Sequence, residues 1–421
     1  MKEEFLVMAG IDWGSREHQV CALDPDRTIL LERRIAHDAA VLGELASSLI
    51  EQAGGDPSKV AIAIEVPHGV IVETLLERGL AIFAINPKQL DRFRDRFSMA
   101  GAKDDRRDAL VLADALRTDR HAFARVSPSS PHIVEMREEG RIHEELREQF
   151  VQAANRLRAQ IERFYPQILA VADTTEPWMW ALIEKAPTPA AARRLRRTQV
   201  EKLLRAHRIR RIDAAGVLKA LRSPAFHVAP GSAEAATRHI KVLIEQLRLL
   251  HHQREHCQHQ LEALLRRCTE DHTETSGSST GAPRPERSDA EILLSLPGVG
   301  TVVGAALLSE AGTPLTNRNL AMLRAVCGVA PVTKRSGKSL TVVRRYACNS
   351  RLRNSCHYLA FNAVRSDHHS HDHYARLRAA GHTHGRALRG VADRLLAVLI
   401  AMLQSRTLYD ASRRQSSCEA A

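Results

Sequence analysis

The stretch "FLVMAGIDWGSREHQVCALD", residues 5–24, decides the fold of the first part of the chain. Two apolar, strand-forming runs, 5–12 and 18–24, flank a short polar segment, which is typical of two neighbouring strands. The first run ends on Asp12. A carboxylate at the end of a buried strand is either a turn or cap residue or a ligand of a metal ion. The second interpretation requires further carboxylates elsewhere.

Strand and helix patterns continue to about residue 125. The next elements are a possible third strand (28–35), a helix that ends at a Gly-Gly pair (39–55) and a continuous apolar strand (59–66). They are followed by a helix (70–79), a strand (80–85) and a last helix (105–117). This alternation predicts an α/β domain in which helices pack on a mixed sheet.

Three further carboxylates fit the metal interpretation. Glu65 ends the continuous apolar strand, and the segment "GAKDDRRDALVLADAL" (101–116) begins the last helix. Asp105 and Asp108 would share one helix face, as would Asp104 and Asp108, and spacing alone does not choose between the pairs. Four converging carboxylates would repel one another, and a hard divalent cation removes that repulsion. The alternative is a set of ordinary caps and a solvated helix face.

The middle of the chain carries two heptad-like helical patterns. Their apolar positions are Ile142, Leu146, Phe150, Ala153, Leu157, Ile161, Phe164 and Ile168, and then Ile240, Leu243, Leu247, Leu250, Cys257, Leu261, Leu264 and Cys268. Arg254 is the one misfit in the second pattern. The two helices form either an antiparallel pair within one chain or a coiled coil between protomers.

The domain boundaries follow from these patterns. We predict an α/β domain over 1–125, a helical region over 126–270, a Ser/Gly/Pro-rich flexible linker over 271–288, a helical domain over 289–410 and a tail over 411–421.

Charge and composition narrow the function. The net charge is +12, the pI is about 9.7, and aromatic residues make up 4% of the chain. This balance favours nucleic acid as the partner and argues against base stacking on aromatic rings as the main contact. The odd count of 7 cysteines, without a C-x-x-C pair, indicates a reducing cytoplasm, and no stretch is apolar for long enough to form a membrane helix. A DNA-binding protein in that compartment is expected to be associated with the nucleoid.

The C-terminal half holds two candidate contacts with nucleic acid. Gly298 and Gly300 lie in a P-G-V-G turn between apolar helices, where free backbone amides suit a phosphate. Ser336 lies in the turn "TKRSGKS", where nearby cations would stabilise a phosphoryl transition state. Those cations are Lys334, Arg335 and Lys338, and Arg344 and Arg345 follow in the same stretch. The alternatives are a plain helical hairpin and a basic turn that binds phosphate without reacting.

Several segments in this order resemble the DEDD-type insertion-sequence transposases, which are serine-containing recombinases described as bridge-RNA-guided. They are "GIDWGSREHQVCALD", "AIEVPHGV", "INPKQLDRFRDRFSMAGAKDDRRDALVLADALR", "LPGVGTVVGAALLSE", "CGVAPVTKRSGKS" and "HYARLRAAGHTHGRALRGVADRLLAVLIAML". The resemblance covers nearly the whole chain, although the middle helices match only in type. Its K-x-D-x-x-D-A motif falls on Lys103, Asp105, Asp108 and Ala109.

The resemblance implies a RuvC-like ribonuclease H domain whose tetrad is Asp12, Glu65, Asp105 and Asp108, with Mg²⁺ or Mn²⁺ as cofactor. It places the nucleophilic serine at Ser336, with Ser339 as the second choice, beside a helix-hairpin-helix-like element. It further implies DNA cleavage and rejoining through a phosphoserine bond, guidance by a structured non-coding RNA that pairs with donor and target DNA, and a homodimer or homotetramer with a shared active site. A hydrolytic junction-resolving nuclease and an inactive nucleic-acid-binding relic remain alternatives.

Overall fold

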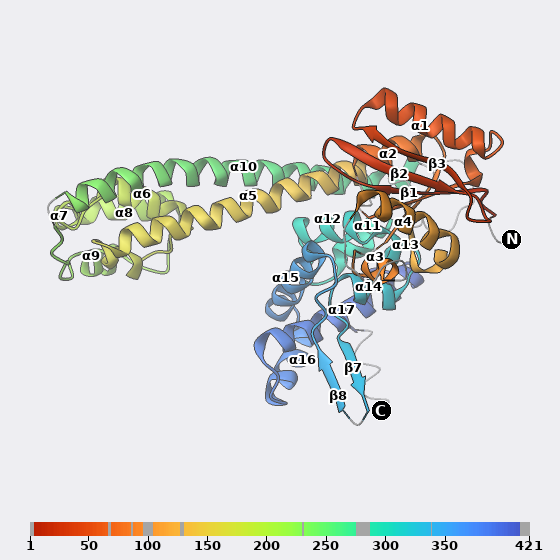
Figure 1. Ribbon diagram of the computed structural model, residues 1–421. Coiled ribbons are helices and arrows are strands. Elements are labelled where there is room, and N and C mark those ends of the chain that lie inside the picture. Colours follow the sequence, from red (N-terminus) through yellow and green to blue (C-terminus); the bar gives the residue numbers. More distant parts are fainter. Residues whose placement is uncertain are drawn as a thin grey trace. The chain divides into compact units, whose positions relative to one another are not determined.

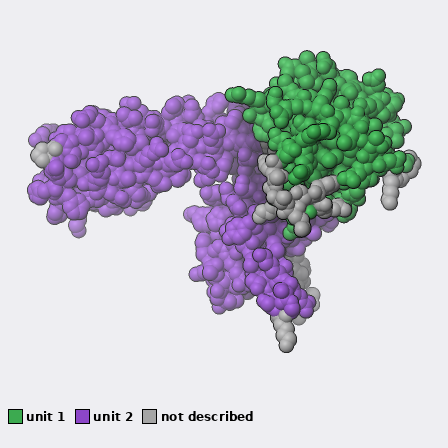
Figure 2. Space-filling model, viewed as in Figure 1, with its two compact units in different colours: residues 1–129 green, residues 130–421 purple. Residues whose placement is uncertain are grey.

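The computed structural model describes residues 4–65, 69–85, 87–95, 104–126, 130–229, 231–274, 287–337 and 339–412. The chain forms two compact units, Met1–Ser129 and Ser130–Ala421 (Figure 2). The predicted linker lies mostly, and the predicted tail largely, outside the described residues, as do Lys103 and Lys338.

The first unit is built on a six-stranded mixed sheet with the order β3-β2-β1-β4-β5-β6 (Figure 1). The strands are β1 (Val7–Asp12), β2 (Glu17–Leu23), β3 (Ile29–Ala36), β4 (Val60–Ile64), β5 (Ala81–Ala84) and β6 (Ala124–Arg125). Strands β1, β4 and β5 are parallel to one another, and the other pairings are antiparallel. The predicted mixed sheet is therefore confirmed, and the arrangement is ribonuclease H-like.

Helices cover both faces of this sheet. They are α1 (Ala39–Gln52), α2 (Val70–Glu77), α3 (Pro87–Arg94) and α4 (Asp105–Asp119). Leu45 of α1 and Ile71 of α2 share a core with Val7 of β1, whereas Val111 of α4 packs with Ala61 of β4 on the other face. Because β1 and β4 are covered on both sides, they are apolar along almost their whole length.

The second unit begins with two long helices, α5 (Pro131–Glu162) and α10 (Ser232–Glu274), which lie side by side in Figure 1. They run antiparallel, because Ile161 near the end of α5 packs with Ile240 near the start of α10, and Met136 packs with Leu261. Of the two arrangements expected for the heptad patterns, the structure shows the pair within one chain.

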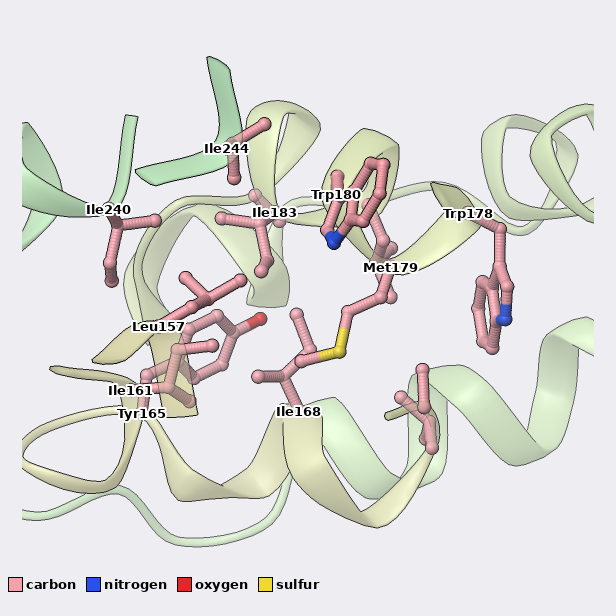
Figure 3. Close-up of a cluster of buried hydrophobic side chains, with 14 of the residues drawn as sticks. Leu157, Ile161, Tyr165, Ile168, Trp178, Met179, Trp180, Ile183, Ile240 and Ile244 are labelled. Atoms are coloured by element: carbon pink, nitrogen blue, oxygen red, sulfur yellow. The ribbon is translucent and has the colours of Figure 1, made fainter. Parts of the chain in front are cut away.

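Four short helices close the far end of this pair. They are α6 (Pro177–Lys185), α7 (Pro189–Arg193), α8 (Arg197–Ala206) and α9 (Ala214–Leu221). Trp178, Trp180 and Tyr165 are almost fully buried there, together with Met179 and Ile168 (Figure 3). Aromatic side chains bury a large apolar area. The few aromatic residues of the chain therefore contribute strongly to this core.

The heptad prediction was wrong at one end of α5. Ile142 is 49% exposed, whereas His143 is only 6% exposed and takes the inward position. The buried series on α5 runs through Met136, His143, Phe150 and Leu157 in steps of seven. A count of apolar residues alone misses a seam position that is occupied by a histidine, and so it shifts the pattern by one residue.

The C-terminal part of the second unit is mainly helical around its own core, in which α15 and α17 pack together. Its elements are α11 (Asp289–Ser295), α12 (Thr301–Glu310), α13 (Gly312–Thr316), α14 (Leu320–Val326), β7 (Val332–Ser336), β8 (Ser339–Val343), α15 (Ser350–Ser366), α16 (His368–Ala379) and α17 (His384–Ser405). The β7–β8 hairpin is an addition to the predicted all-helical domain. Among the described residues, no helix has the length and apolar content to cross a membrane.

Candidate active site

Two of the predicted carboxylates end neighbouring parallel strands. Asp12 is the last residue of β1, and Glu65 follows β4 directly. The strands pair in register, with Ile11 opposite Ile64, so the next residue of each chain segment emerges at the same edge of the sheet. Both side chains are partly exposed. The carboxyl edge of the sheet therefore presents two acidic groups side by side, as the strand patterns predicted.

Helix α4 brings a third carboxylate to this edge. A Cβ atom on Gly10 of β1 would lie 2.1 Å from the carbonyl oxygen of Ala109 and 2.6 Å from the backbone nitrogen of Ala113. Only glycine permits this close approach of the helix backbone to the strand. Asp108, the residue before Ala109, is 1% exposed and is held next to the end of β1 by this packing.

The two remaining aspartates of the segment have different positions. Asp104 is the N-cap of α4, and its carboxylate accepts a hydrogen bond from the backbone nitrogen of Arg106 at 3.2 Å. Asp105 is the first residue of the helix and is exposed. Asp104 thus has a structural task as a helix cap, and Asp105 is accessible to a ligand. The role of Asp105 as a ligand stays a prediction.

Sequence reasoning missed the cation of this site, Arg94. Its Nε donates to Asp108 Oδ1 at 2.6 Å and its Nη2 donates to Asp108 Oδ2 at 2.8 Å, while Nη1 donates to Asp91 at 2.6 Å. Burial opposes the charge on Arg94, but Asp108, Asp91 and Glu65 outweigh it and raise its pKa. The dense basic segment "DRFRDRF" was the one available signal, and it does not show which arginine turns inward.

The chemistry of the donor set fits a hard divalent cation. Asp12, Glu65 and Asp108 carry carboxylate oxygens of the kind that could hold such an ion, and Arg94 supplies positive charge to Asp108 and Glu65. Within the described part of the chain, no three acidic, histidine or cysteine groups are arranged closely enough to hold an ion. A cation bound to Asp108 would share that carboxylate with the guanidinium group of Arg94.

Ser336 lies at the tip of the β7–β8 hairpin. It pairs with Ser339 across the turn, and Gly337 between them has φ +55°, which favours glycine. Directly opposite residues of a hairpin share a face, so Ser336 and Ser339 lie on the same face as Lys334. Arg335 lies on the other face. The described residues of the turn are exposed, so the hydroxyl group of Ser336 is open to a large substrate.

The base of the hairpin carries a basic cluster that was only partly predicted. Arg344 lies over the ring of Tyr346, with 5.6 Å to the ring centroid. Burial, Arg344 and Arg386 lower the pKa of Arg389, so these three guanidinium groups repel one another. A polyanion would relieve that repulsion. Arg345 has a different position, because its Nε donates to the carbonyl oxygen of Ala330 at 3.3 Å.

The two glycines of the P-G-V-G turn also differ. Gly298 has φ +86°, and a Cβ atom there would lie 2.3 Å from the carbonyl oxygen of Leu359 in α15. Gly298 therefore lets the turn pack closely on α15. Gly300 is exposed, has open space around its Cα and caps α12 without a side-chain hydrogen bond. Contact of either glycine with nucleic acid stays a prediction.

Comparison with known protein families agrees with this arrangement. A DEDD transposase model of the IS110 group, described as Transposase, matches residues 9–166, and a model described as Transposase IS116/IS110/IS902 family matches residues 290–375. The first match contains the acidic sheet edge, and the second contains the turn before α12 and the hairpin with Ser336. The fold and these two matches define a transposase, an enzyme that cuts DNA and transfers its strands.

Individual relatives extend the match over the whole chain. The mini-circle putative transposase for IS117 of Streptomyces coelicolor is 31% identical over 420 residues, which are 98% of this chain and 97% of that protein. The putative transposase y4uE of Sinorhizobium fredii is 43% identical over 236 residues, 56% of this chain and 64% of that protein. The uncharacterized 43.6 kDa protein of insertion element IS110 from Streptomyces coelicolor is 27% identical over 430 residues, 100% of this chain and 99% of that protein. The chain belongs to the IS116/IS110/IS902 family of transposases.

Proposed function

We propose that this transposase cuts and rejoins DNA through a serine nucleophile and a divalent-cation site in its ribonuclease H-like, RuvC-type domain. The observation that carries the proposal is the acidic edge of the sheet, where Asp12 and Glu65 end paired strands and Asp108 is held beside them by α4. Asp12, Glu65, Asp105 and Asp108 would hold Mg²⁺ or Mn²⁺. When bound, the cation supplies positive charge to the scissile phosphate.

The proposed covalent step is a transesterification at phosphorus. The Oγ atom of Ser336 attacks a DNA phosphodiester, the new bond from Oγ to phosphorus forms, and the bond from phosphorus to one sugar oxygen breaks. The serine proton is lost and the departing sugar oxygen gains one, so a free hydroxyl and a phosphoserine result. Attack by the hydroxyl of another strand reverses the step, so rejoining needs no external energy source.

The chain's own cations support this step. Lys334 shares the hairpin face of Ser336, and Lys338 and Arg335 adjoin it in sequence. These groups and the Arg344 cluster would neutralise charge as it develops on the five-coordinate phosphorus. Serine is a weak nucleophile at its ordinary pKa and needs activation. We place that activation in the carboxylate site of a second protomer, and this requires a homodimer or homotetramer.

Selection of DNA is assigned to a structured non-coding RNA of the same element. The chain is basic and poor in aromatic residues, which suits contacts with phosphate backbones and leaves sequence choice to base pairing. The C-terminal turn before α12, a helix-hairpin-helix-like element, would contribute to strand binding through backbone amides. The heptad seams of α5 and α10 are used within the chain, so the outer face of this helix pair would supply its contacts between protomers.

Strand cleavage by single carboxylate variants tests the metal site. Asp12→Asn, Glu65→Gln, Asp105→Asn and Asp108→Asn should each reduce Mg²⁺-dependent cleavage by about 10²-fold or more, because the cation loses a charged ligand. Asp104→Asn is the matched control, because asparagine still caps a helix. The cleavage activity of this variant should stay within about threefold of the parent. If the Asp104 variant lost cleavage and the Asp105 variant retained it, Asp104 and not Asp105 would be the metal ligand.

A further inference from the structure

The second unit contains a cleft of about 410 Å³ between α5, α10, α12 and α15. Its volume falls in the usual range for ligand pockets. Four arginines line it, Arg137, Arg147, Arg254 and Arg351, against two glutamates, Glu144 and Glu310. No described residue of the β7–β8 hairpin lines the cleft, and Gly300 is the one predicted site residue in its lining.

Two of these arginines are already neutralised. Arg147 donates to both carboxylate oxygens of Glu144, at 2.8 and 2.9 Å. Arg351 donates to Glu310 at 3.2 Å. Arg137 also has a partner, since its Nε donates to the carbonyl oxygen of Ser309 at 3.0 Å.

Arg254 is the misfit of the second heptad pattern, and the cleft explains it. It lies seven residues from both Leu247 and Leu261, and so it occupies a seam position of α10. Its guanidinium carbon is 4.9 Å from the ring centroid of Phe150. In the described part of the chain it forms no hydrogen bond and no ion pair, and its Nε is shielded from solvent. Burial lowers the pKa of Arg254 and outweighs Glu144 and Glu255, which favour its charge. A partly buried cation without a hydrogen bond or an ion pair is costly, and an anion would remove the cost.

His143 is the corresponding polar residue on the seam of α5. It is 6% exposed and lines the same cleft. Its imidazole makes no hydrogen bond to any described residue. Burial and the nearby charge of Arg254 lower its pKa, so at neutral pH the ring is uncharged and offers one N–H donor. The seam of the helix pair is thus interrupted twice, by two polar side chains that face one cleft and form no hydrogen bond to a described residue.

The third contribution comes from the start of α12. Gly300, Thr301 and Val302 line the cleft, and this ten-residue helix has no side-chain cap at its N-terminus. The first amides of a helix lack intrahelical acceptors and carry the positive end of the helix dipole. They are suited to an anion such as a phosphate group.

We propose that this cleft is a docking site for one phosphate of a nucleic-acid strand, held by Arg254, His143 and the first backbone amides of α12. The strand would be fixed where the long helix pair meets the C-terminal domain. The inference rests on the proposed function only in requiring that a strand passes this region. It involves neither the carboxylates nor Ser336, so failure of the cleavage tests and failure of this one are distinguishable.

Binding by full-length variants tests the site. The probe is a short fluorescein-labelled single-stranded oligonucleotide of mixed sequence, and its anisotropy is measured over a range of salt concentrations. Arg254→Gln should bind the oligonucleotide about 5–10-fold more weakly. The slope of log affinity against log salt should become shallower by about the amount expected for the loss of one phosphate contact. Arg266→Gln removes the same charge from an exposed position on α10 that pairs with Glu262, and should change binding by less than about twofold.

A second variant separates contact from charge. His143→Phe keeps a ring of similar size but removes the donor, so it should weaken binding while leaving the salt slope unchanged. Without any anion, Arg254→Gln should melt no lower than the parent, because it removes an unpaired charge. This melting measurement also confirms that the variant is folded.

Inorganic phosphate distinguishes a strand from a free anion. If phosphate raises the melting temperature of the parent but not of Arg254→Gln, and both bind the oligonucleotide equally, the cleft is a free-anion site and the strand proposal is wrong. Equal affinity and equal salt slope for the parent and Arg254→Gln also overturn it. So does an effect of Arg266→Gln as large as that of Arg254→Gln, because the loss would then reflect charge alone.

Discussion

Arg94 holds Asp108 through two parallel hydrogen bonds, at 2.6 and 2.8 Å, beneath the acidic edge of the sheet. The Asp108 side chain is 1% exposed and that of Arg94 is 27% exposed. A buried carboxylate needs a compensating charge, and in this structure the guanidinium provides it. A divalent cation at the same edge would compete with Arg94 for Asp108.

Removal of Arg94 should therefore make the fold depend on divalent cations. Arg94→Gln leaves Asp108 without its cation and should lower the free energy of unfolding by about 2–3 kcal/mol in a chelator. Mg²⁺ should restore more stability to this variant than it adds to the parent. Denaturant unfolding with and without Mg²⁺ measures both effects.

The control for this experiment lies two residues away. Arg92 is exposed on the same helix, and Arg92→Gln should unfold like the parent in both conditions. If Arg94→Gln were as stable as the parent in the chelator, or responded to Mg²⁺ in the same way, Arg94 would not be the group that compensates the charge of Asp108.

The turn before α12 offers a matched pair of glycines. Gly298→Ala places a Cβ atom against the backbone of Leu359 at a φ of +86°, so we expect a loss of about 2–4 kcal/mol in the stability of the second unit. Gly300→Ala meets no atom within 4 Å and should unfold nearly like the parent. Thermal unfolding of both variants checks this, and equal stability of the two would contradict a packing role for Gly298.

His18 makes the first unit sensitive to acid. Gly14 N donates to His18 Nδ1 at 3.2 Å, and His18 Nε2 lies 2.9 Å from His37 Nδ1, so the ring is held in its neutral form. Burial and His37 lower its pKa from the usual 6.5. Below that pH the unfolded chain takes up a proton that the folded chain excludes, so stability falls as the pH drops.

The expected result is a melting temperature that decreases by several degrees from about pH 7 to pH 5. His18→Gln should flatten this decrease, although His143 and His357, whose pKa values are also lowered, keep part of it. His121→Gln changes an exposed histidine and serves as the control. The same pH dependence in the His18 variant and the parent would assign the effect to other groups.

The parts of the molecule that local patterns determine could be predicted. Alternating and continuous apolar runs predicted the strands that carry Asp12 and Glu65, because a strand buried on both faces must be apolar almost throughout. The two long helices followed from their heptads. The polar segment after Val332 was expected as a turn, but its pairing as a hairpin depends on contacts between exposed residues and leaves little apolar signal.

The parts that depend on distant residues could not be predicted in this way. Nothing in the spacing of Arg94 and Asp108 indicates that they meet, since α3 and α4 have to pack first. His143 and Arg254 are 111 positions apart in the sequence; Arg254 is a misfit in its heptad pattern, and the seam position of His143 is missed altogether. They become a site only when the helices pair and α12 closes the cleft.

The proposed mechanism requires a covalent bond between Ser336 and DNA. The direct measurement is a denaturing gel of the full-length protein after incubation with Mg²⁺, DNA carrying the ends of its element and RNA transcribed from that element. The parent should give a band of protein linked to DNA, and Ser336→Ala should give none while still binding both nucleic acids. Ser339→Ala, on the same hairpin face, should retain the band. A linked band of parental intensity from Ser336→Ala would show that Ser336 is not the nucleophile. Cleavage by the parent without any linked band would favour hydrolysis by a junction-resolving nuclease.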